Sequence, residues 1–587
     1  MKYKNFKIIT FLLALTLLLS ACSNKEDIKK TGDNKSQKET TSLSNLKDGT
    51  YKKSANGYDR ELTVEVEIKD NKIKDIKLLE NHETTAVIER AFPIIKQRIV
   101  ESNSPNVDSV SAATASSFAV KTAVLEALED AGLKKGSIEI SNSTGYEPDR
   151  KLKDGKDKET DILVIGGGPS GLAAAIEAKQ KGANKVTLIE KLDILSGNGK
   201  FDMNFYDLPN SKAMKDKENE VTKEQFKEKV FGKAWDTKER QEAQTEGAFV
   251  LDNWLRDLGI ELEYNYGGKG AMNHMRSEKE YAGNHIQTKL EENAKKLGIE
   301  ILTGTKGTDL IIENGEAKGA NVEDKSTRYK INAKATIIAT GGFSNNKELL
   351  KEYAPGSENI PTSNQMGTTG DFVKIAKKHN IKLDHMGNLS IFPKILDPRR
   401  DLTGHSGNNF VYLNSKGERF IDETIRNNVV AANKLMENKP VYFVLDQEGL
   451  NSFFRTRSHY EKGYYKKANN IEDLAKLINA NAETLKSTLE TFNKAVDGEI
   501  KDPFRKKAAS KKLDLNGPLY FAKITQGIHM TKGGIVANEK AEVLNNSNEI
   551  IKGLFAAGEV TDISGGYSAS VVFGRISGDS AVKFIKK

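Results

Sequence analysis

A glycine-rich segment that follows an apolar run is the first place in this 587-residue chain where residue types and spacing suggest chemistry. Residues 166–171 read Gly-Gly-Gly-Pro-Ser-Gly and have the form G-x-G-x-x-G. Glycines at these places permit a tight turn and a close approach of the backbone to a pyrophosphate, and the N-terminus of the following helix faces its negative charge. We therefore predict that the phosphates of a dinucleotide bind at Gly166, Gly168, Ser170 and Gly171.

The elements around this segment occur in the order that a dinucleotide-binding unit requires. Residues 161–165 form a continuous apolar run, typical of a buried parallel strand, and residues 172–181 predict a helix of small residues. Residues 185–190 predict a second strand, which ends at Glu190, and this carboxylate can accept hydrogen bonds from the adenosine ribose. The alternative is a glycine-rich turn that binds no ligand.

Two later segments favour FAD over NAD. Residues 335–342 predict a strand that runs into glycines, and residues 553–559 predict a strand that ends in Gly-Glu. Three such pieces along one chain resemble the large FAD-dependent oxidoreductases, in which the first piece holds ADP and the last reaches the ribityl chain and the isoalloxazine. We therefore predict FAD, with further contacts at Thr340, Gly341, Gly342, Gly558 and Glu559.

From about residue 161 to 587 the chain resembles the flavoprotein subunits of the fumarate reductase and succinate dehydrogenase family. More narrowly, it resembles the soluble exported branch that includes flavocytochrome c fumarate reductase and urocanate reductase. The motifs that carry this resemblance are residues 190–198, 339–346, 367–371, 417–423, 531–534 and 557–561. The resemblance implies additional FAD contacts at Lys191, Gly197, Asn198, Asp371 and Ser570.

The fold class implied by this resemblance is α/β, with a Rossmann-like FAD-binding domain interrupted by an α+β capping domain. We expect the FAD-binding domain at residues 159–386 and 527–587, and the cap at residues 387–526. Members of the family that attach FAD use a histidine after the first nucleotide-binding unit. No histidine lies between Gly171 and Met272, so we expect non-covalent FAD.

The resemblance also implies the chemistry. Hydride passes from flavin N5 to an activated double bond, while an arginine shortly after the G-x-R-F segment protonates the neighbouring carbon. Arg426 takes that place with a spacing one residue shorter, and His529 is the second candidate catalytic residue. Because an arginine is a poor acid, an acidic group must reload it, and Asp422 and Glu423 are nearby. The alternative for Arg426 is a surface arginine at the start of a helix.

Three segments depart from the family pattern for binding two substrate carboxylates. Met530 stands where the family has the histidine of His-Thr-Met-Gly-Gly, and we expect His529, one residue early, to point elsewhere on its strand. Phe392 replaces the histidine of Ala-His-Pro, and residues 565–570 lack the arginine of Asn-Arg-Leu-Gly-Gly. We therefore expect a substrate other than fumarate, a less charged and bulkier enone or acrylate. The alternative is that other residues bind the carboxylates, for which the candidates are Arg399, Arg400 and His405.

A second flavin is indicated in a small α+β domain at residues 46–136, which a linker at 137–158 joins to the large unit. Residues 62–68 and 73–79 predict two strands, and residues 118–131 predict a helix. With residues 107–117 they resemble the FMN-binding domain of exported flavoproteins, in which the last hydroxyl of Ser-Gly-Ala-Thr-x-Ser/Thr is esterified to FMN. That hydroxyl is Ser116, and a flavin transferase would have to attach the FMN. Ala112 stands where glycine is usual, which strains the turn if the position needs a positive φ. The alternative is a serine-rich helix start without FMN.

The first residues predict export and anchoring. A basic start and an apolar run at residues 8–19 precede Leu19-Ser20-Ala21-Cys22, which is typical of a signal peptide over residues 1–21 and a lipidated Cys22. The polar residues 22–45 read as a flexible tether. We therefore expect the protein on the outer face of the bacterial cytoplasmic membrane. The alternative is an ordinary signal peptide with an incidental cysteine.

Composition excludes several classes of protein. The 90 basic and 82 acidic residues are interspersed, so no nucleic-acid partner is expected. The single cysteine excludes disulfides and Cys-ligated zinc, iron–sulfur or haem sites, and no metal site is expected. Together the motifs predict a reductase that passes electrons from a membrane-side donor through FMN and FAD to an unsaturated carbonyl or carboxylate compound, as a terminal acceptor in anaerobic respiration. The alternatives are a dehydrogenase of the same family and a non-enzymatic flavin carrier.

Overall fold

The computed structural model describes residues 43–147, 150–195, 197–200, 206–232, 235–277, 281–404, 407–562 and 566–587. Leu43–Lys587 form one compact unit. The predicted signal peptide, Cys22 and most of the tether lie outside the described residues.

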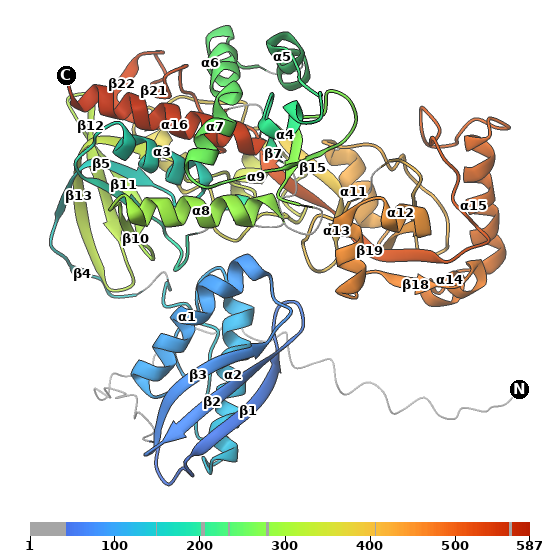
Figure 1. The fold of residues 1–587 in the computed structure, drawn as a ribbon, viewed down its shortest axis with the longest axis horizontal. Coiled ribbons are helices and arrows are strands. Elements are labelled where there is room, and N and C mark those ends of the chain that lie inside the picture. Colours follow the sequence, from blue (N-terminus) through green and yellow to red (C-terminus); the bar gives the residue numbers. More distant parts are fainter. Residues whose placement is uncertain are drawn as a thin grey trace, which may run out of the picture. The chain divides into compact units, whose positions relative to one another are not determined.

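The small domain consists of an antiparallel sheet covered by two helices (Figure 1). Its sheet has the order β1-β2-β3, with strands at Gly49–Asn56, Glu61–Lys69 and Lys72–Glu80. Apolar side chains alternate with polar ones along β2 and are buried against α1 (Thr85–Ser102) and α2 (Thr114–Asp130). The two strands and the helix predicted from the sequence are present, whereas β1 and α1 were not predicted.

The FAD-binding domain is built on a mixed sheet of order β10-β6-β5-β13-β12-β22-β21. Its central strands β5 (Lys158–Ile165), β6 (Val186–Ile189) and β13 (Thr327–Ile338) pair in parallel and are buried, as their apolar runs predict. Helices α3 (Pro169–Gln180) and α16 (Gly566–Ile585) pack against each other, and both contact this sheet. The glycine-rich turn therefore lies at the carboxyl end of β5, where doubly wound sheets bind their ligands.

The remaining elements of this domain extend or cover the same sheet, or form small sheets beside it. The strands are β4 (Lys153–Asp154), β7 (Tyr206–Asp207), β8 (Tyr264–Tyr266), β9 (Asn273–Met275), β10 (Glu300–Leu302), β11 (Lys306–Glu313), β12 (Glu316–Glu323), β14 (Leu383–Asp384), β20 (Gly534–Ile535), β21 (Glu542–Leu544) and β22 (Ile550–Ala556). The helices are α4 (Lys212–Lys215), α5 (Lys223–Phe231), α6 (Lys238–Phe249), α7 (Leu251–Asp257), α8 (Ala282–Lys296), α9 (Lys347–Tyr353) and α10 (Asp371–Lys378), with a 3-10 turn at Asn198–Lys200.

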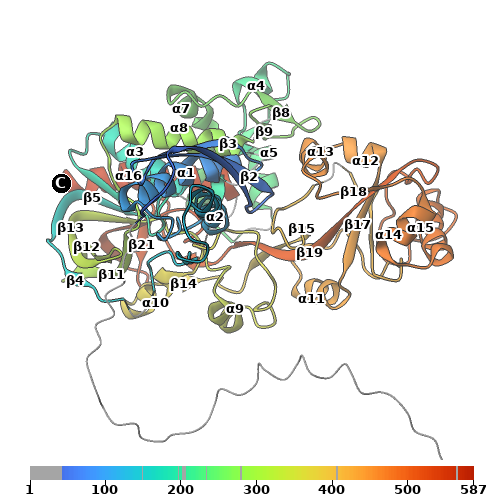
Figure 2. The ribbon, with the colours of Figure 1, turned by 90° about the horizontal axis from the view of Figure 1, so that it is seen from below.

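The cap has its own sheet, of order β15-β19-β17-β16, with β18 also paired to β19. Strand β19 (Leu519–Thr531) runs the length of the cap, and its last residues pair with β15 (Leu389–Leu396) next to the FAD-binding domain (Figure 2). The other cap elements are β16 (Val411–Leu413), β17 (Val441–Asp446), β18 (Lys466–Ala468), α11 (Val429–Glu437), α12 (Gln447–Asn451), α13 (Phe454–Glu461), α14 (Ile471–Ile478) and α15 (Ala482–Val496). The predicted fold class is confirmed: an α/β domain with an inserted α+β cap, after a small α+β domain.

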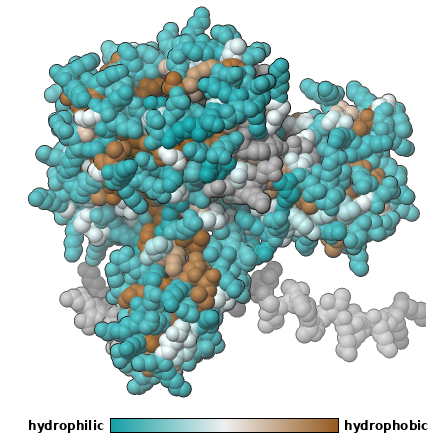
Figure 3. Space-filling model, in the orientation of Figure 1, coloured by the Kyte–Doolittle hydropathy of each residue, from teal (hydrophilic) through white to brown (hydrophobic). Residues whose placement is uncertain are grey.

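Polar side chains cover most of the face seen in Figure 3. Within the described residues, no helix combines the length and apolar character that crossing a bilayer would need.

Candidate active site

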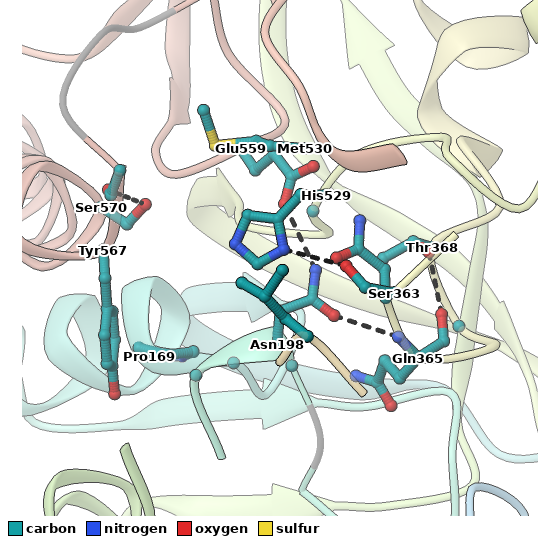
Figure 4. Close-up of a pocket in the computed structure, with 18 of the residues that line it drawn as sticks. Pro169, Asn198, Ser363, Gln365, Thr368, His529, Met530, Glu559, Tyr567 and Ser570 are labelled. Atoms are coloured by element: carbon teal, nitrogen blue, oxygen red, sulfur yellow. Dashed lines mark hydrogen bonds between the residues drawn. The ribbon is translucent and has the colours of Figure 1, made fainter. Parts of the chain in front are cut away.

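One large cavity, of about 1920 Å³, brings together residues that are far apart in the sequence. Its walls include the glycine-rich turn after β5, the serine-rich segment before α2, and the parts of β15, α13 and β19 where the cap meets the FAD-binding domain. Figure 4 shows the part of the cavity around His529, Glu559 and Asn198. Both predicted flavin motifs and the predicted substrate site thus line a single space.

The glycine-rich turn is shaped by close backbone contacts. Gly166 has φ +117°, and a Cβ added there would lie 2.2 Å from the carbonyl oxygen of Ala339. A Cβ at Gly171 would lie 1.9 Å from the carbonyl oxygen of Gly166, so only glycine lets α3 start this close to the strand. Gly166, Gly168 and Ser170 line the cavity. Gly166 is also needed for the tight turn, and Gly171 is needed for the close packing of α3 against that turn.

A buried hydroxyl group beside this turn indicates that a pyrophosphate would fit there. The Ser170 Oγ, in the first turn of α3, is buried and has no hydrogen-bond partner among the described residues. A phosphate oxygen at the start of α3 would satisfy this hydroxyl and the free N–H groups of the helix N-terminus. The residues present therefore fit FAD phosphates.

Glu190 directly follows β6, lies beside the turn and is buried. One carboxylate oxygen accepts a hydrogen bond from the Gly167 N–H at 2.9 Å, and the other accepts one from the Leu192 N–H at 3.0 Å. Each oxygen retains acceptor capacity for a ribose hydroxyl. Lys191, the next residue, donates to the Asp371 carboxylate at 2.7 Å, and both line the cavity.

The other predicted FAD residues surround the middle of the cavity. Gly197, Asn198, Thr340, Gly341, Gly558 and Glu559 line it, whereas Gly342 lies behind the wall, where a Cβ would clash with Thr531 and Glu559. The Asn198 amide donates to Glu559 at 3.4 Å and accepts from the Gln365 N–H at 3.2 Å (Figure 4). Burial raises the pKa of Glu559 to about 7.

The start of α16 closes one side of the cavity. Ser570 lines it and donates to the Gly566 carbonyl at 3.0 Å. The buried Tyr567 hydroxyl, also at the wall, has no hydrogen-bond partner within the described part of the chain. Gly565, the first residue of the segment in which the family arginine is missing, lies outside the described residues.

His529 lines the cavity because β19 has an irregular register. Ser390 pairs with Met530 but Ile391 pairs with Ile528, so His529 is an extra residue in its strand. Such a bulge lets neighbouring side chains face the same side, and the expectation that His529 points elsewhere was wrong. Its Nδ1 lies 2.9 Å from the Ser363 Oγ (Figure 4), and burial together with Arg455 lowers its pKa to about 4.

Arg426 also lines the cavity, on a loop before α11, and its side chain is exposed. Its guanidinium carbon lies 5.3 Å from the centre of the Phe392 ring. No ion pair to Arg426 occurs among the described residues. Asp422 accepts hydrogen bonds from Thr424, so its carboxylate is turned to its own loop.

The expectation that Glu423 reloads Arg426 was wrong. Glu423 is buried and bonded to two other arginines, with its oxygens 2.7 Å from Arg419 Nε and 2.7 Å from Arg505 Nε. Asp502 completes this network through Arg419. Because both oxygens are held by fixed cations, Glu423 has a structural role that anchors the G-x-R-F segment to the cap.

Two cations at the cap end of the cavity were not predicted from the sequence. Lys394 on β15 and Arg455 on α13 are both buried and both line the cavity. Of the alternatives named from the sequence, Arg400 lines the cavity, Arg399 is bonded to Asp59 in the small domain, and His405 lies outside the described residues. Isolated basic residues give no signal of burial in a sequence, so pattern reasoning could not select Lys394 or Arg455.

The serine-rich segment lies at the other end of the cavity. Ser116, in the first turn of α2, is buried and its hydroxyl donates to the Glu83 carboxylate. Ala112 has φ +76°, so the position normally filled by glycine does need a left-handed backbone. The Ser111 N–H donates to Asp193 at 2.8 Å, which joins this segment to the loop just after Glu190.

Comparisons with known proteins agree with this geometry. Residues 161–570 match the family model described as an FAD binding domain, and residues 57–129 match that of an FMN-binding domain. The chain is similar to an NADH:fumarate oxidoreductase of Klebsiella pneumoniae, with 27% identity over 92% of this chain and 59% of that protein. It is also similar to a urocanate reductase of Eggerthella lenta, with 29% identity over 90% of this chain and 91% of that protein.

A solved structure is similar as well. The open conformation of a flavocytochrome c3 fumarate reductase matches with a TM-score of 0.64 and 26% identity, over 77% of this chain and 85% of that one. The chain spans about three fifths of the length of the Klebsiella relative and of an NADH:acrylate oxidoreductase of Vibrio harveyi.

Proposed function

Since the chain belongs to the FAD binding domain family and also carries an FMN-binding domain, we propose that it is a flavin-dependent reductase of carbon–carbon double bonds conjugated to a carbonyl or carboxylate. The observation that carries this proposal is the single cavity lined by both flavin motifs and by Arg426. The relatives named above for fumarate, acrylate and urocanate support the class of reaction.

The chain's own residues supply binding, orientation and a proton. Bound FAD supplies hydride chemistry at its ring, and the N-terminus of α3 with Ser170 holds its phosphates. The first N–H groups of α16, from Gly566 on, would be available to stabilise negative charge on a bound flavin. Arg426 gives a proton to the substrate carbon next to the carbonyl, and its exposed side chain takes a proton back from solvent. The Phe392 ring lies beside its guanidinium group.

We further propose that Ser116 carries FMN as an ester, placed by a flavin transferase, and that electrons enter through this FMN. Support comes from the buried position of Ser116 at the start of α2, on the wall shared with the FAD residues. The lipid anchor at Cys22, the extracytoplasmic location and the membrane-side donor are also proposals, which rest on the sequence of the first residues. In that setting the enzyme serves as a terminal reductase.

The test is reoxidation of the reduced enzyme. The purified holoenzyme is reduced without oxygen and mixed with a panel of unsaturated acids, amides and ketones, and the flavin absorbance is followed. We expect reoxidation by some members of the panel and slow reoxidation by fumarate. In Arg426→Ala, reoxidation should slow by at least about a hundredfold while FAD content stays unchanged, because Arg426 lies outside the nucleotide site.

Two outcomes would favour the other classes of function. Reduction of the enzyme by saturated acids, without reoxidation by unsaturated ones, would indicate a dehydrogenase. No reaction with either kind of compound would indicate a flavin carrier. Full activity in Arg426→Ala would remove Arg426 as the proton donor and leave the reductase in place.

A further inference from the structure

Arg455 is a buried cation whose hydrogen-bonding capacity is only partly used. It lies in α13 of the cap, is 5% exposed, and lines the cavity. Its Nη1 donates to the Leu402 carbonyl at 2.6 Å, whereas its buried Nε has no hydrogen-bond partner among the described residues. A guanidinium presents five N–H donors, and burying one without an anion is costly. The free edge of Arg455 therefore calls for an anionic partner that enters from the cavity.

Lys394 is a second buried cation at the same end. It lies in β15, is 7% exposed, and its Nζ lies 4.2 Å from the centre of the Phe410 ring and 5.5 Å from that of Phe443. These ring faces partly compensate its charge, but no carboxylate pairs with it within the described residues. The two rings contact the Lys394 ammonium group on one side, and an anion in the cavity can contact it on the other.

Each of the two cations lies near a predicted catalytic residue, His529 or Arg426. Arg455 is close enough to His529 to lower its pKa, and Lys394 is close enough to Arg426 to be affected by its charge. Between these pairs, the Phe392 ring lies 4.9 Å from the His529 ring and 5.3 Å from Arg426. Asp401 also lines the cavity. Its negative charge helps to raise the pKa of Tyr58, in the small domain, and of Tyr464. The cap end therefore carries a positive charge beside an aromatic ring.

We propose that Arg455 and Lys394 form a carboxylate-binding site, and that the substrate is an unsaturated acid whose carboxylate they hold while its apolar part lies against Phe392. This inference rests on the proposed function and narrows its substrate from carbonyl compounds in general to acids. It differs from the sequence-based expectation of a less charged substrate. The new cations come from the cap, not from the segments in which the family ligands are replaced.

Binding of saturated acids tests the site without turnover. Calorimetric titration of the oxidised holoenzyme compares 3-phenylpropionate with 3-phenylpropionamide, and propionate with propionamide. We expect each acid to bind at least about tenfold more tightly than its amide, because a charge-assisted hydrogen bond is lost in the amide. Equal affinities, or no detectable binding of either acid, would contradict the proposal.

Variants assign this preference to the two side chains. Arg455→Gln and Lys394→Met should each reduce the acid-over-amide preference by about tenfold, and Arg455→Lys should retain part of it. Arg457→Gln is the matched control, because it removes a charge from the same helix, where Arg457 bonds to the Asn451 carbonyl. A preference that persists in the Arg455→Gln/Lys394→Met double variant, which lacks both cations, would also overturn the proposal.

The outcomes separate this inference from the reductase proposal. If the acids bind as expected but no unsaturated compound reoxidises the enzyme, the carboxylate site stands and the reductase proposal fails. If amides and ketones reoxidise the enzyme as fast as the acids and bind as tightly, the reductase stands and the carboxylate site fails.

Discussion

Lys394 is the cation of the proposed carboxylate site whose charge should depend on pH near neutrality. Burial, with smaller contributions from Arg426 and Arg505, lowers its pKa to about 7, so its ammonium is charged below that pH and neutral above it. Because only the charged form attracts a carboxylate, the affinity for 3-phenylpropionate should fall as the pH rises through about 7. Titrations between about pH 5.5 and 8.5 measure this, and the affinity for the amide should stay constant.

Glu559 is the group that could be confused with Lys394 in this measurement, since burial raises its pKa to about 7. His529, with a pKa of about 4, stays neutral over the whole range. In Lys394→Met the fall in affinity should disappear if Lys394 causes it. A fall that remains in this variant would assign the pH dependence to Glu559.

Ser116 should carry the FMN ester in protein made with its modifying enzyme. Its hydroxyl bonds to the buried Glu83 carboxylate, which orients it, and the start of α2 offers N–H groups to the phosphate. Peptide mass spectrometry should find the adduct on Ser116 and none in Ser116→Ala. Thr114→Ala and Ser117→Ala are the matched controls in the same segment and should keep the adduct. An adduct on either of these residues would correct the register, and none at all would reject the attachment.

Some of the site residues can be predicted from the sequence, and others cannot. The glycine-rich turn and Glu190 are predictable because phosphate binding needs a fixed spacing of glycines, a helix and an acid. Lys394 and Arg455 are not, because their burial depends on how β15, β19 and α13 pack together. His529 was misplaced because a bulge is a property of strand pairing, which alternation within one strand does not reveal.

At the scale of elements, the segment that carries Arg426 is held by a buried ionic network. Glu423 accepts from Arg419 and Arg505, so Glu423→Gln leaves the buried Arg505 without its carboxylate partner and Arg419 with Asp502 alone. We expect a loss of about 3 kcal/mol or more in the free energy of unfolding, measured by urea denaturation. Glu418→Gln, which changes an exposed carboxylate in the same segment, should stay within about 0.5 kcal/mol of the native protein. An equally small loss in Glu423→Gln would show that the network does not hold the segment.

Elements with a uniform pattern were predictable, and those with mixed patterns were not. Strand β5 is a continuous apolar run and β2 alternates strictly, so both were found. Strand β1 has Lys52 and Lys53 next to each other, and α1 has Pro93 inside it, which obscures the helical pattern. Both are stabilised by packing in the small-domain core, which outweighs their local signals.

At the scale of the whole molecule, the proposed lipid anchor would determine where the enzyme works. The Leu19-Ser20-Ala21-Cys22 stretch follows an apolar run, and a lipid on Cys22 would hold the chain at a membrane through a polar tether. Cys22→Ala should release the protein from membranes or leave it unprocessed, as judged by fractionation and N-terminal peptide analysis. Cys22→Ser serves as a second variant with nearly the same volume. Normal processing and membrane retention in both would reject the anchor.

The contact between the two flavin-binding domains should make them unfold together. Asp193 and Ser111 exchange two hydrogen bonds, of 2.8 and 2.7 Å, and Arg98 pairs with the Asp193 carboxylate at 2.9 Å. This places the serine-rich segment beside the loop after Glu190, so the same contact that joins the domains also brings the two motifs to one cavity. Asp193→Ala removes the carboxylate and leaves Arg98 without this partner.

We expect Asp193→Ala to lower the melting temperature of the small domain by roughly 5 °C or more, since a charged hydrogen bond is worth about 1.5–3 kcal/mol and the domain is small. Calorimetry should then resolve two transitions in the variant where the native protein has one. Asp216→Ala is the control, because its ion pair with Lys212 is exposed and lies in the large unit alone. If Asp193→Ala melts as the native protein does, other contacts such as Arg90 with Glu291 hold the domains together. A double variant that lacks both pairs should then show two transitions. A single transition in that variant would show that the remaining contacts, such as Arg399 with Asp59, are enough to couple the domains.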